Sequence, residues 1–391
     1  MWLYLIIFFI PVLAFFYRKR TVVYGKPIEG FENSVIFLFL IFISLMIFVG
    51  ISDMLGGYDR YIYGELFDEL ADNMRNGSNI FSSFIFFEYP KEIGYDFLNV
   101  IIAYLTANRY IFILILTVII YTLTFISFKR YMTNYPYAVV LFLALMFFFT
   151  FTYLRQILAA SIAWLSIRYI IDRKFWKFLL VIIVACLFHN SAIILFPFYF
   201  LPIRKYRIGN ILLVMLICLI LGVTGITSTL YDAYGDFSGS TERSAEYATE
   251  AGFRIAYMVE ALFFLSLILL NYRKIPMDKT RLVLCNMALT FCGILLFFIK
   301  SENGGRLSWF YMIGLISTLT YILAFNVRRK QLAILMICVS LFLYLRIYTS
   351  WQVYLNLYPY KTFFTNGYRE GDYIWENYEY DHGYEKDKFY R

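Results

Sequence analysis

The chain has 391 residues, of which 61% are hydrophobic, 21% are aromatic and only 16% are charged. This composition excludes a soluble cytosolic enzyme, a disordered protein and a nucleic-acid-binding protein, and it is typical of a chain whose main solvent is lipid. The net charge of +8 fits that class, because Lys and Arg gather in the cytoplasmic loops of membrane proteins. We therefore expect the lipid bilayer as a partner and no nucleic acid.

The first apolar run is followed, rather than preceded, by basic residues, namely Arg18, Lys19 and Arg20. A secretory signal has the reverse order, so this run is expected to be a membrane span with its N-terminus outside. Further apolar runs predict an all-α, polytopic integral membrane protein with about twelve transmembrane helices. The predicted spans are residues 2–17, 33–51, 110–128, 137–153, 157–171, 175–188, 190–203, 208–225, 255–271, 282–299, 307–326 and 331–349.

Two long apolar stretches must be divided. Residues 137–171 would form a helix of about 52 Å at about 1.5 Å per residue, whereas the hydrocarbon core is about 30 Å thick. The chain is therefore expected to fold back near Arg155. Residues 174–205 are basic at both ends and contain a His-Asn-Ser sequence at 189–191, which predicts a hairpin whose ends lie on one side.

The loops predict the topology. More than half of the 35 Lys and Arg residues lie in alternate loops with few acidic residues, and these loops are assigned to the cytoplasm, which places both termini outside. Residues 95–107 are too short to span comfortably and are predicted to form a re-entrant or interfacial helix. The prediction is one polytopic membrane domain over 1–349, with outer loops at 52–96 and 226–254. A polar, Tyr-rich outer tail follows over 350–391 and is expected to be mobile.

Cysteine and glycine patterns exclude two kinds of site. The five cysteines stand singly in apolar runs, without ligands at metal spacing, so we expect neither a metal site nor a cofactor. No glycine motif for nucleotide phosphates is present, which argues against transport driven by ATP. The candidates for function are therefore polar side chains at membrane depth, where a charge is costly.

Arg155 and Gln156 lie at a predicted outer turn between two spans. A guanidinium stays charged and matches two phosphate oxygens at once, so Arg155 is a candidate for binding phosphate, with an interfacial anchor as the alternative. His189 and Asn190 lie at the break of the hairpin, on the same predicted side. His189 is a candidate ligand, acid or base, and a satisfied core histidine is the alternative.

Further candidates lie on the predicted outer side. They are Arg254 and Arg306 at the starts of spans, Asp59 after the second span, and Glu92 and Tyr95 before the short helix. A solvated face is the alternative for the acidic residues, and the pair Gly304-Gly305 either lets backbone approach a ligand or forms a turn. Cations suit a diphosphate, carboxylates suit hydroxyl activation and aromatic faces suit sugars, so the group favours chemistry on a lipid-linked glycan.

Several segments resemble the EpsG-type polysaccharide polymerases, relatives in role of the Wzy polymerases. The strongest are LRQILAASIAW at 154–164 and IIVACLFHNSAIILFPFYFLP at 182–202, which occur in the family's order and spacing. Further matches are YDRYIY at 58–63, EIGYDFLN at 92–99 and GRLSWFYMI at 305–313, so the resemblance covers about 52–326. Thr152 and Tyr153 depart from the family pattern, which often has a polar Asn there.

The resemblance implies a metal-independent glycosyltransferase of the bacterial cytoplasmic membrane that makes capsule, exopolysaccharide or O-antigen. It would move a growing glycan from undecaprenyl diphosphate to the next lipid-linked repeat unit at the outer face. Arg155 and Arg306 would hold the departing diphosphate. His189 would bind it or accept the acceptor proton, with Glu92 or Asp59 as competing bases. Gln156, Asn190, Arg254, Tyr95 and Tyr311 would bind substrate. The expected partners are the lipid-linked donor and acceptor, with a chain-length regulator or flippase.

The alternative function is a flippase or transporter of the same lipid-linked oligosaccharide, whose arginines would line a passage. A transporter is expected to show repeated halves and polar groups across the membrane depth. In this sequence the unusual charges gather on one predicted side and no internal repeat is visible, so the polymerase is favoured. A membrane acyltransferase would more typically carry a compact His–carboxylate motif, which is lacking.

Overall fold

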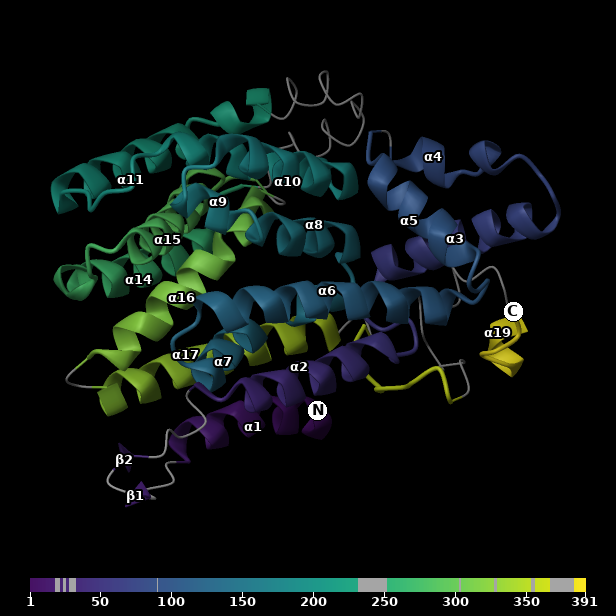
Figure 1. Cartoon of the computed structure of the whole chain (residues 1–391), viewed down its shortest axis with the longest axis horizontal. Helices are drawn as coiled ribbons and strands as arrows, with labels where there is room; N and C mark the ends of the chain where they lie inside the picture. The colour runs from purple at the N-terminus through teal and green to yellow at the C-terminus, as the bar shows by residue number, and fades with distance from the viewer. Residues whose placement is uncertain are drawn as a thin grey trace. The chain divides into compact units, whose positions relative to one another are not determined.

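A computed structural model of the chain describes residues 1–17, 22–23, 26–27, 33–89, 91–230, 252–301, 304–326, 329–352, 356–365 and 383–391. These residues are almost entirely helical (Figure 1), and the strands among them are the antiparallel pair β1 (Val22–Val23) and β2 (Lys26–Pro27). The predicted all-helical class is confirmed. Arg18, Lys19 and Arg20, most of the predicted outer loop 226–254 and much of the predicted tail lie outside the described residues.

The helices form two compact units. The first unit contains residues 1–130, 134–158 and 330–391, and the second contains 131–133 and 159–329. The first unit holds α1 (Trp2–Phe16), α2 (Val35–Gly50), α3 (Tyr58–Arg75), η2 (Ile80–Ser82), α4 (Ile85–Glu88), α5 (Ile93–Ala103), α6 (Arg109–Tyr131), α7 (Tyr135–Leu145), η3 (Phe148–Phe151), α17 (Arg329–Gln352) and α19 (Gly383–Lys386). The second holds α9 (Ile167–Ile171), α10 (Phe175–Phe188), η4 (Asn190–Phe200), α11 (Ile208–Val223), α14 (Ile255–Leu270), η5 (Tyr272–Lys274), α15 (Lys279–Phe297), η6 (Gly304–Tyr311) and α16 (Met312–Ala324), while α8 (Leu154–Trp164) begins in the first unit and continues into the second.

Each predicted span contains a helix. Within the described ranges, five helices are long and apolar enough to cross a membrane, and the shorter apolar helices there are 10–17 residues long. The five are Arg109–Tyr131, Leu154–Ile171, Lys279–Phe297, Gly304–Ala324 and Lys330–Trp351. The structure therefore has the apolar helices of a membrane protein, while the number of spans and the side of the termini stay predictions.

A helix break is present at both predicted places, and the reversal of the chain near Arg155 stays a prediction. The helical stretch is interrupted between η3 and α8, directly before Arg155. The second break falls at His189, whose backbone is extended (φ −161°, ψ 119°) between α10 and η4. The chain reverses there, because the ring of Phe178 near the start of α10 lies 4.9 Å from that of Tyr199 near the end of η4. The predicted hairpin is confirmed.

The short helix α5 has two different faces. One face is buried and carries Tyr95, Asp96 and Asn99, whereas the other is apolar and exposed and carries Ile93, Phe97 and Ile101. An 11-residue helix is about 16 Å long, which is too short to cross the hydrocarbon core. An exposed apolar stripe on so short a helix fits the predicted interfacial position.

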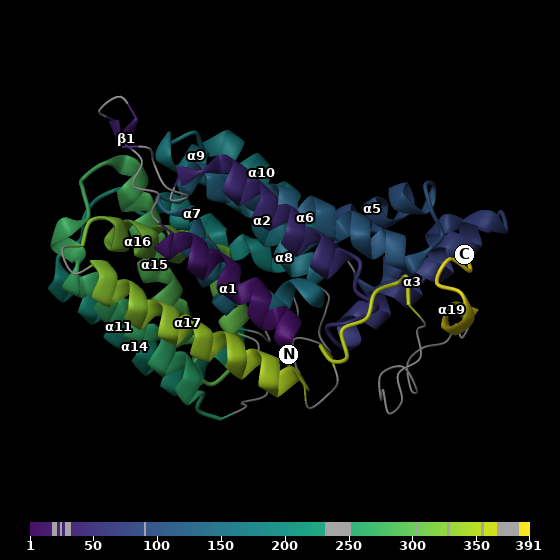
Figure 2. The ribbon, with the colours of Figure 1, turned by 90° about the horizontal axis from the view of Figure 1, so that it is seen from below.

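In the first unit, the N-terminal helix packs against the long C-terminal helix. The Tyr344 hydroxyl on α17 donates to the carbonyl oxygen of Tyr4 at 2.9 Å, and the Tyr4 hydroxyl donates to that of Leu357 at 2.8 Å. Figure 2 shows α1 beside α17. These hydrogen bonds satisfy buried hydroxyl groups that would otherwise be costly in an apolar core.

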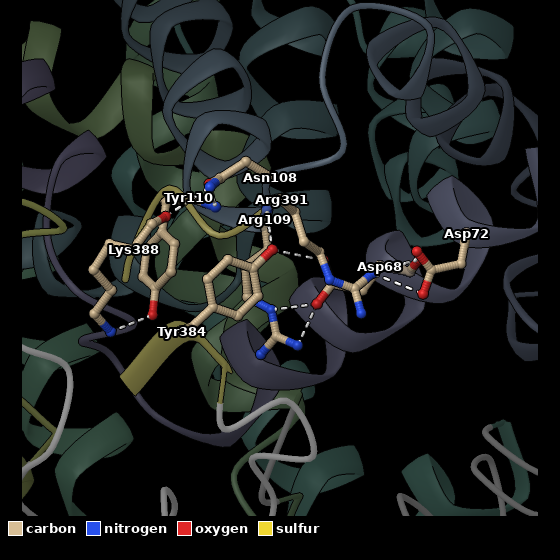
Figure 3. Close-up of polar contacts among 8 residues, drawn as sticks. All are labelled: Asp68, Asp72, Asn108, Arg109, Tyr110, Tyr384, Lys388 and Arg391. Atoms are coloured by element: carbon tan, nitrogen blue, oxygen red, sulfur yellow. Dashed lines mark hydrogen bonds and ion pairs between the residues drawn. The ribbon is translucent and has the colours of Figure 1, made fainter. Parts of the chain in front are cut away.

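The end of the chain also packs in the first unit, which differs from the expectation of a mobile tail. Figure 3 shows Lys388 beside Tyr110, and Arg391 beside Asp72. Lys388 Nζ lies 2.9 Å from Oδ1 of the buried Asp53, and Asn108 donates to the Lys388 carbonyl oxygen at 2.7 Å. Arg391 pairs with Asp72 at 2.8 Å. A buried carboxylate requires a cation beside it, and the tail supplies that cation to Asp53.

In the second unit, α15 lies at the centre of the helix packing. Figure 1 shows α11, α14 and α16 beside it. A glycine brings α16 close to α15, because a Cβ at Gly314 would lie 2.8 Å from the Leu284 carbonyl oxygen. The indole of Trp164 on α8 donates to the Phe310 carbonyl oxygen at 3.1 Å, which fixes η6 in the same unit.

Candidate active site

Arg155 and Glu92 form an ion pair in the first unit. Arg155 is the second residue of α8, and Glu92 directly precedes α5. The exposed fractions are 12% for the Arg155 side chain and 8% for the Glu92 side chain. Water screens such a pair weakly, so its charges act strongly on neighbouring groups.

Three tyrosine rings surround the guanidinium of Arg155. Its central carbon lies 3.4 Å from the ring centroid of Tyr89, 5.5 Å from that of Tyr63 and 5.7 Å from that of Tyr95. All three tyrosines are buried. Cation–π attraction is strongest in desolvated surroundings, so the rings hold Arg155 in one orientation.

Asp96 lies on the buried face of α5, one turn after Glu92. Its Oδ1 atom is buried without a hydrogen-bond partner among the described residues, and the same holds for Nε of Arg155. Burial, with a smaller contribution from Glu92, raises the pKa of Asp96 to about 7 against the opposing effect of Arg155. A carboxyl group with a pKa near 7 is suited to general acid or base catalysis at neutral pH. We refer to Tyr63, Tyr89, Glu92, Tyr95, Asp96 and Arg155 as the Arg155 cluster.

Arg60 holds the backbone that supports this cluster. Its buried guanidinium donates to the carbonyl oxygens of Phe151 at 3.2 Å, Val49 at 3.2 Å and Ser52 at 3.0 Å. Because Phe151 ends η3 just before α8, this side chain ties the start of α3 to the residues that lead to Arg155. Gly56, with a φ of +122°, lies so close to Phe151 that a Cβ would be 2.9 Å from its carbonyl oxygen.

The structure brings three predicted site residues of the first unit together, namely Glu92, Tyr95 and Arg155. Gln156 is buried directly after Arg155. Asp59 is half-buried on α3, one turn before Tyr63, and interacts with that side chain electrostatically. Asp59 therefore lies near these residues, and its electrostatic interaction with Tyr63 connects it to them.

His189 caps η4 in the second unit. Its Nδ1 accepts a hydrogen bond from the backbone N–H of Ser191 at 3.3 Å and lies 2.7 Å from the Ser191 hydroxyl oxygen. Because Nδ1 accepts this bond, the neutral ring carries its proton on Nε2. In this tautomer Nε2 is a donor, which suits an anion better than it suits the acceptance of a proton. Asn190 follows as the first residue of η4.

Arg254 and Arg306 also lie in the second unit, and both are half-buried. Tyr257 interacts electrostatically with both. The neighbouring glycines serve packing within the protein, because a Cβ at Gly305 would lie 2.5 Å from the Tyr257 ring and Gly304 is equally close to α15. The two arginines thus share a tyrosine neighbour in a tightly packed region.

The remaining predicted site residue, Tyr311, is buried, and its hydroxyl donates to the Ile194 carbonyl oxygen at 2.7 Å. This bond links η6 to η4 within the second unit. The predicted site residues thus fall into two groups, one in each unit. Their convergence on one site stays a prediction.

The Arg155 cluster combines a fixed cation with two different carboxyl groups. No group of three His, Cys, Asp or Glu residues in the described ranges is placed to hold a metal ion. Glu92 pairs with the cation, whereas Asp96 lies in surroundings that favour its protonated form up to neutral pH. One carboxyl group is therefore ionised and paired with the cation, and the other can bind or release a proton near neutral pH. Such a pair is suited to proton transfer beside a developing negative charge.

Comparison with known protein families gives a match. The sequence model of the EpsG family matches residues 35–362, which is most of the chain. The chain belongs to the EpsG family. At family level, this membership supports a function of the polysaccharide-polymerase type, and together with the apolar helices it supports a membrane protein. No curated protein and no solved structure matches the chain.

The whole Arg155 cluster lies within the region that matches the EpsG family. Sequence reasoning did not select three of its members as site residues, Tyr63, Tyr89 and Asp96, because they stand in a charged segment that is typical of a solvated loop. The spacing of polar residues in this segment nevertheless indicates a helix face. Glu92, Asp96 and Asn99 recur at spacings of four and three, which places them on one face of a helix. In this EpsG-family chain, that polar helix face is the buried one.

Proposed function

We propose that this EpsG-family protein polymerises polysaccharide at the outer face of the bacterial cytoplasmic membrane, with about twelve spans and both termini outside. The donor is a growing glycan on undecaprenyl diphosphate, and the acceptor is the next lipid-linked repeat unit. One observation carries the proposal: Asp96, with a pKa raised to about 7, lies beside the buried Arg155–Glu92 pair. Glycosyl transfer from a diphosphate needs both a base and a cation.

In the proposed reaction, an acceptor hydroxyl oxygen attacks the anomeric carbon of the donor. The new glycosidic bond forms while the bond from the anomeric carbon to the diphosphate oxygen breaks, and the electron pair leaves with the diphosphate. Asp96 takes the hydroxyl proton. Arg155 balances the negative charge that develops, while Arg254, Arg306 and the Nε2 proton of His189 bind the diphosphate.

Asp96 is favoured as the base for three reasons. Glu92 already pairs with Arg155. His189 uses Nδ1 as an acceptor and presents a proton at Nε2. Asp59 is linked to the cluster through Tyr63, whereas Asp96 lies on the helix that begins next to Glu92. A base must reach the proton that it removes, so these positions rank Asp96 before the other candidates.

The proposal assigns the other polar residues to binding. Tyr95, Gln156 and Asn190 contact the sugars of the two substrates, and Tyr311 supports the η4 segment that follows His189. The chemistry uses protein side chains without a metal ion. A chain-length regulator or a flippase is the proposed protein partner, because a polymerase at the outer face depends on delivery of lipid-linked units.

The test is a reaction in liposomes that contain the purified full-length protein and a defined lipid-linked repeat unit. We expect a ladder of longer products on a gel, and we expect Asp96→Asn to leave single repeats while its unfolding temperature stays near that of the wild type. A folded wild-type protein that gives single repeats would contradict the proposal. Movement of a fluorescent lipid-linked unit across the bilayer without a ladder would identify the transporter instead.

A further inference from the structure

A groove runs between α11 and α15 in the second unit. It encloses about 460 Å³, which is within the range of ligand sites, and its lining is almost entirely apolar. We call it the α11–α15 groove; residues that line it include Ile194 of η4, Val214 and Met215 of α11, Gly293 and Phe297 of α15, and Phe298 directly after α15. The groove is partly open, so a long flexible chain could enter it.

Two glycines explain why the groove exists. At Gly222 the backbones of α11 and α15 almost touch, since a Cβ there would lie 2.6 Å from the Phe297 carbonyl oxygen. One turn earlier on α15, a Cβ at Gly293 would meet the side chains of Cys218 and Met215 only at 3.8 Å. The helix backbones therefore come closest to contact at Gly222, whereas Gly293 faces side chains of α11 at ordinary contact distance and lines the groove.

One end of the groove adjoins two cationic residues. Phe298, which lines that end, packs against Gly304, two residues before Arg306. The backbone N–H of Arg254 donates to the carbonyl oxygen of Ile299, the next residue after Phe298, at 2.8 Å. The groove residue Phe298 is thus next to the segments that carry two half-buried arginines, and Glu260 acts on the same Tyr257 as these arginines.

We infer that the α11–α15 groove holds the isoprenoid chain of the lipid-linked donor, with its diphosphate at Arg254 and Arg306. The inference rests on the proposed function and adds the place where the lipid binds. The apolar lining matches a hydrocarbon chain, and two guanidinium groups at one end match the charge of a diphosphate. A phospholipid carries a phosphodiester with a single negative charge, so the arginine pair favours the diphosphate lipid.

The experiment uses the full-length protein in liposomes without acceptor, so no turnover is required. The probe is a polyprenyl diphosphate with a photoactivatable diazirine on its isoprenoid chain. After irradiation, mass spectrometry is expected to find the label on peptides of α11, α15 and η4. Unlabelled polyprenyl diphosphate is expected to remove the label, and phosphatidylglycerol at the same concentration is expected to leave it.

Two tryptophan variants form a matched pair. Val214 lines the groove and Leu213 is its neighbour outside the lining, and their exposed fractions are similar at 53% and 57%. Val214→Trp fills the groove and should lower labelling at least tenfold, whereas Leu213→Trp should leave it unchanged. Because both positions are exposed, both variants should unfold at the wild-type temperature. The double variant Arg254→Gln/Arg306→Gln should lose the preference for polyprenyl diphosphate over polyprenol.

Three results would overturn the inference: equal competition by phosphatidylglycerol, label outside α11, α15 and η4, or equal losses in the two tryptophan variants. Failure of the proposed function looks different. A wild-type protein that is labelled in the groove but makes no ladder with acceptor would reject the polymerase and leave the groove assignment in place. A full ladder from Val214→Trp would reject the groove assignment and leave the polymerase in place.

Discussion

Among the described residues of the first unit, Arg109–Asp68 and Arg155–Glu92 are both buried ion pairs between arginine and carboxylate, and their surroundings differ. Arg109 Nε donates to Asp68 Oδ2 at 2.7 Å, and the hydroxyl of Tyr384 donates to Asp68 Oδ1 at 3.3 Å (Figure 3). The Tyr384 ring also lies under the Arg109 guanidinium, 4.9 Å from its central carbon. Both oxygens of Asp68 therefore have donors.

The Arg155 cluster is less completely satisfied. Nε of Arg155 and Oδ1 of Asp96 are buried without partners among the described residues, whereas no side-chain atom of Asp68 or Arg109 is in that state there. Satisfied polar networks stabilise a fold, and unpaired buried atoms are costly unless a ligand uses them. The difference agrees with our proposal that the Arg155 cluster serves chemistry, whereas the Arg109 pair serves stability.

The largest expected effect on stability comes from Arg109→Ala. The change leaves Asp68 buried without its cation, so the free energy of unfolding should fall by about 3–5 kcal/mol. Chemical denaturation in detergent measures it, and polymer yield per folded molecule should stay near that of the wild type. The control Asp68→Asn/Arg109→Met removes both charges and should cost less than the single change. An equal cost would show that the lone charge is not the cause.

The largest expected effect on activity comes from Arg155→Ala. Loss of one preorganised cation beside a developing negative charge should lower the polymerisation rate about 100- to 1,000-fold. Gel analysis of the glycan ladder measures the rate, with thermal unfolding as the check that the protein is folded. Arg155→Lys keeps the charge but loses the planar contact with Tyr89, so it should recover only part of the rate. Normal ladders from both variants would place Arg155 outside the reaction.

Much of the fold can be predicted from local sequence patterns, whereas the ion pairs between distant parts of the chain cannot. Apolar runs and charged turns predict the helices and the breaks beside Arg155 and His189, because these depend on neighbouring residues. The Arg155–Glu92 pair joins positions 63 residues apart, and the Lys388–Asp53 pair joins positions 335 apart. Which distant residues become partners depends on how whole helices pack against one another, and local sequence patterns do not contain that information. The polar composition of the tail therefore gave no sign that Lys388 is buried.

A smaller effect on stability is expected from the titration of Asp96. Its pKa is about 7 in the folded protein and about 3.9 in an unfolded chain, so the folded state binds the proton more tightly. Stability should therefore fall as the pH rises through 7, by about 1 kcal/mol between pH 6 and pH 8. Denaturation at the two pH values measures this change, and Asp96→Asn should remove most of it.

The polymerisation rate should depend on pH in the opposite direction. If Asp96 takes the acceptor proton, its ionised form is required, and the wild-type rate should rise up to about tenfold between pH 6 and pH 8. The Arg109 pair provides the contrast, because Arg109→Ala should keep the wild-type pH profile. A rate that falls over this range would reject Asp96 as the base.

The smallest effect is expected from Asp59→Asn. Asp59 is half-buried and reaches the cluster through its electrostatic interaction with Tyr63, whereas Glu92 contacts Arg155 directly. Water screens a partly exposed charge, so such interactions are worth less than about 1 kcal/mol. The ladder should form at a rate within about fivefold of the wild type, while Glu92→Gln, which breaks the buried pair, should lower it much further. Equal losses in the two variants would give Asp59 a direct role and extend the reacting group to the start of α3.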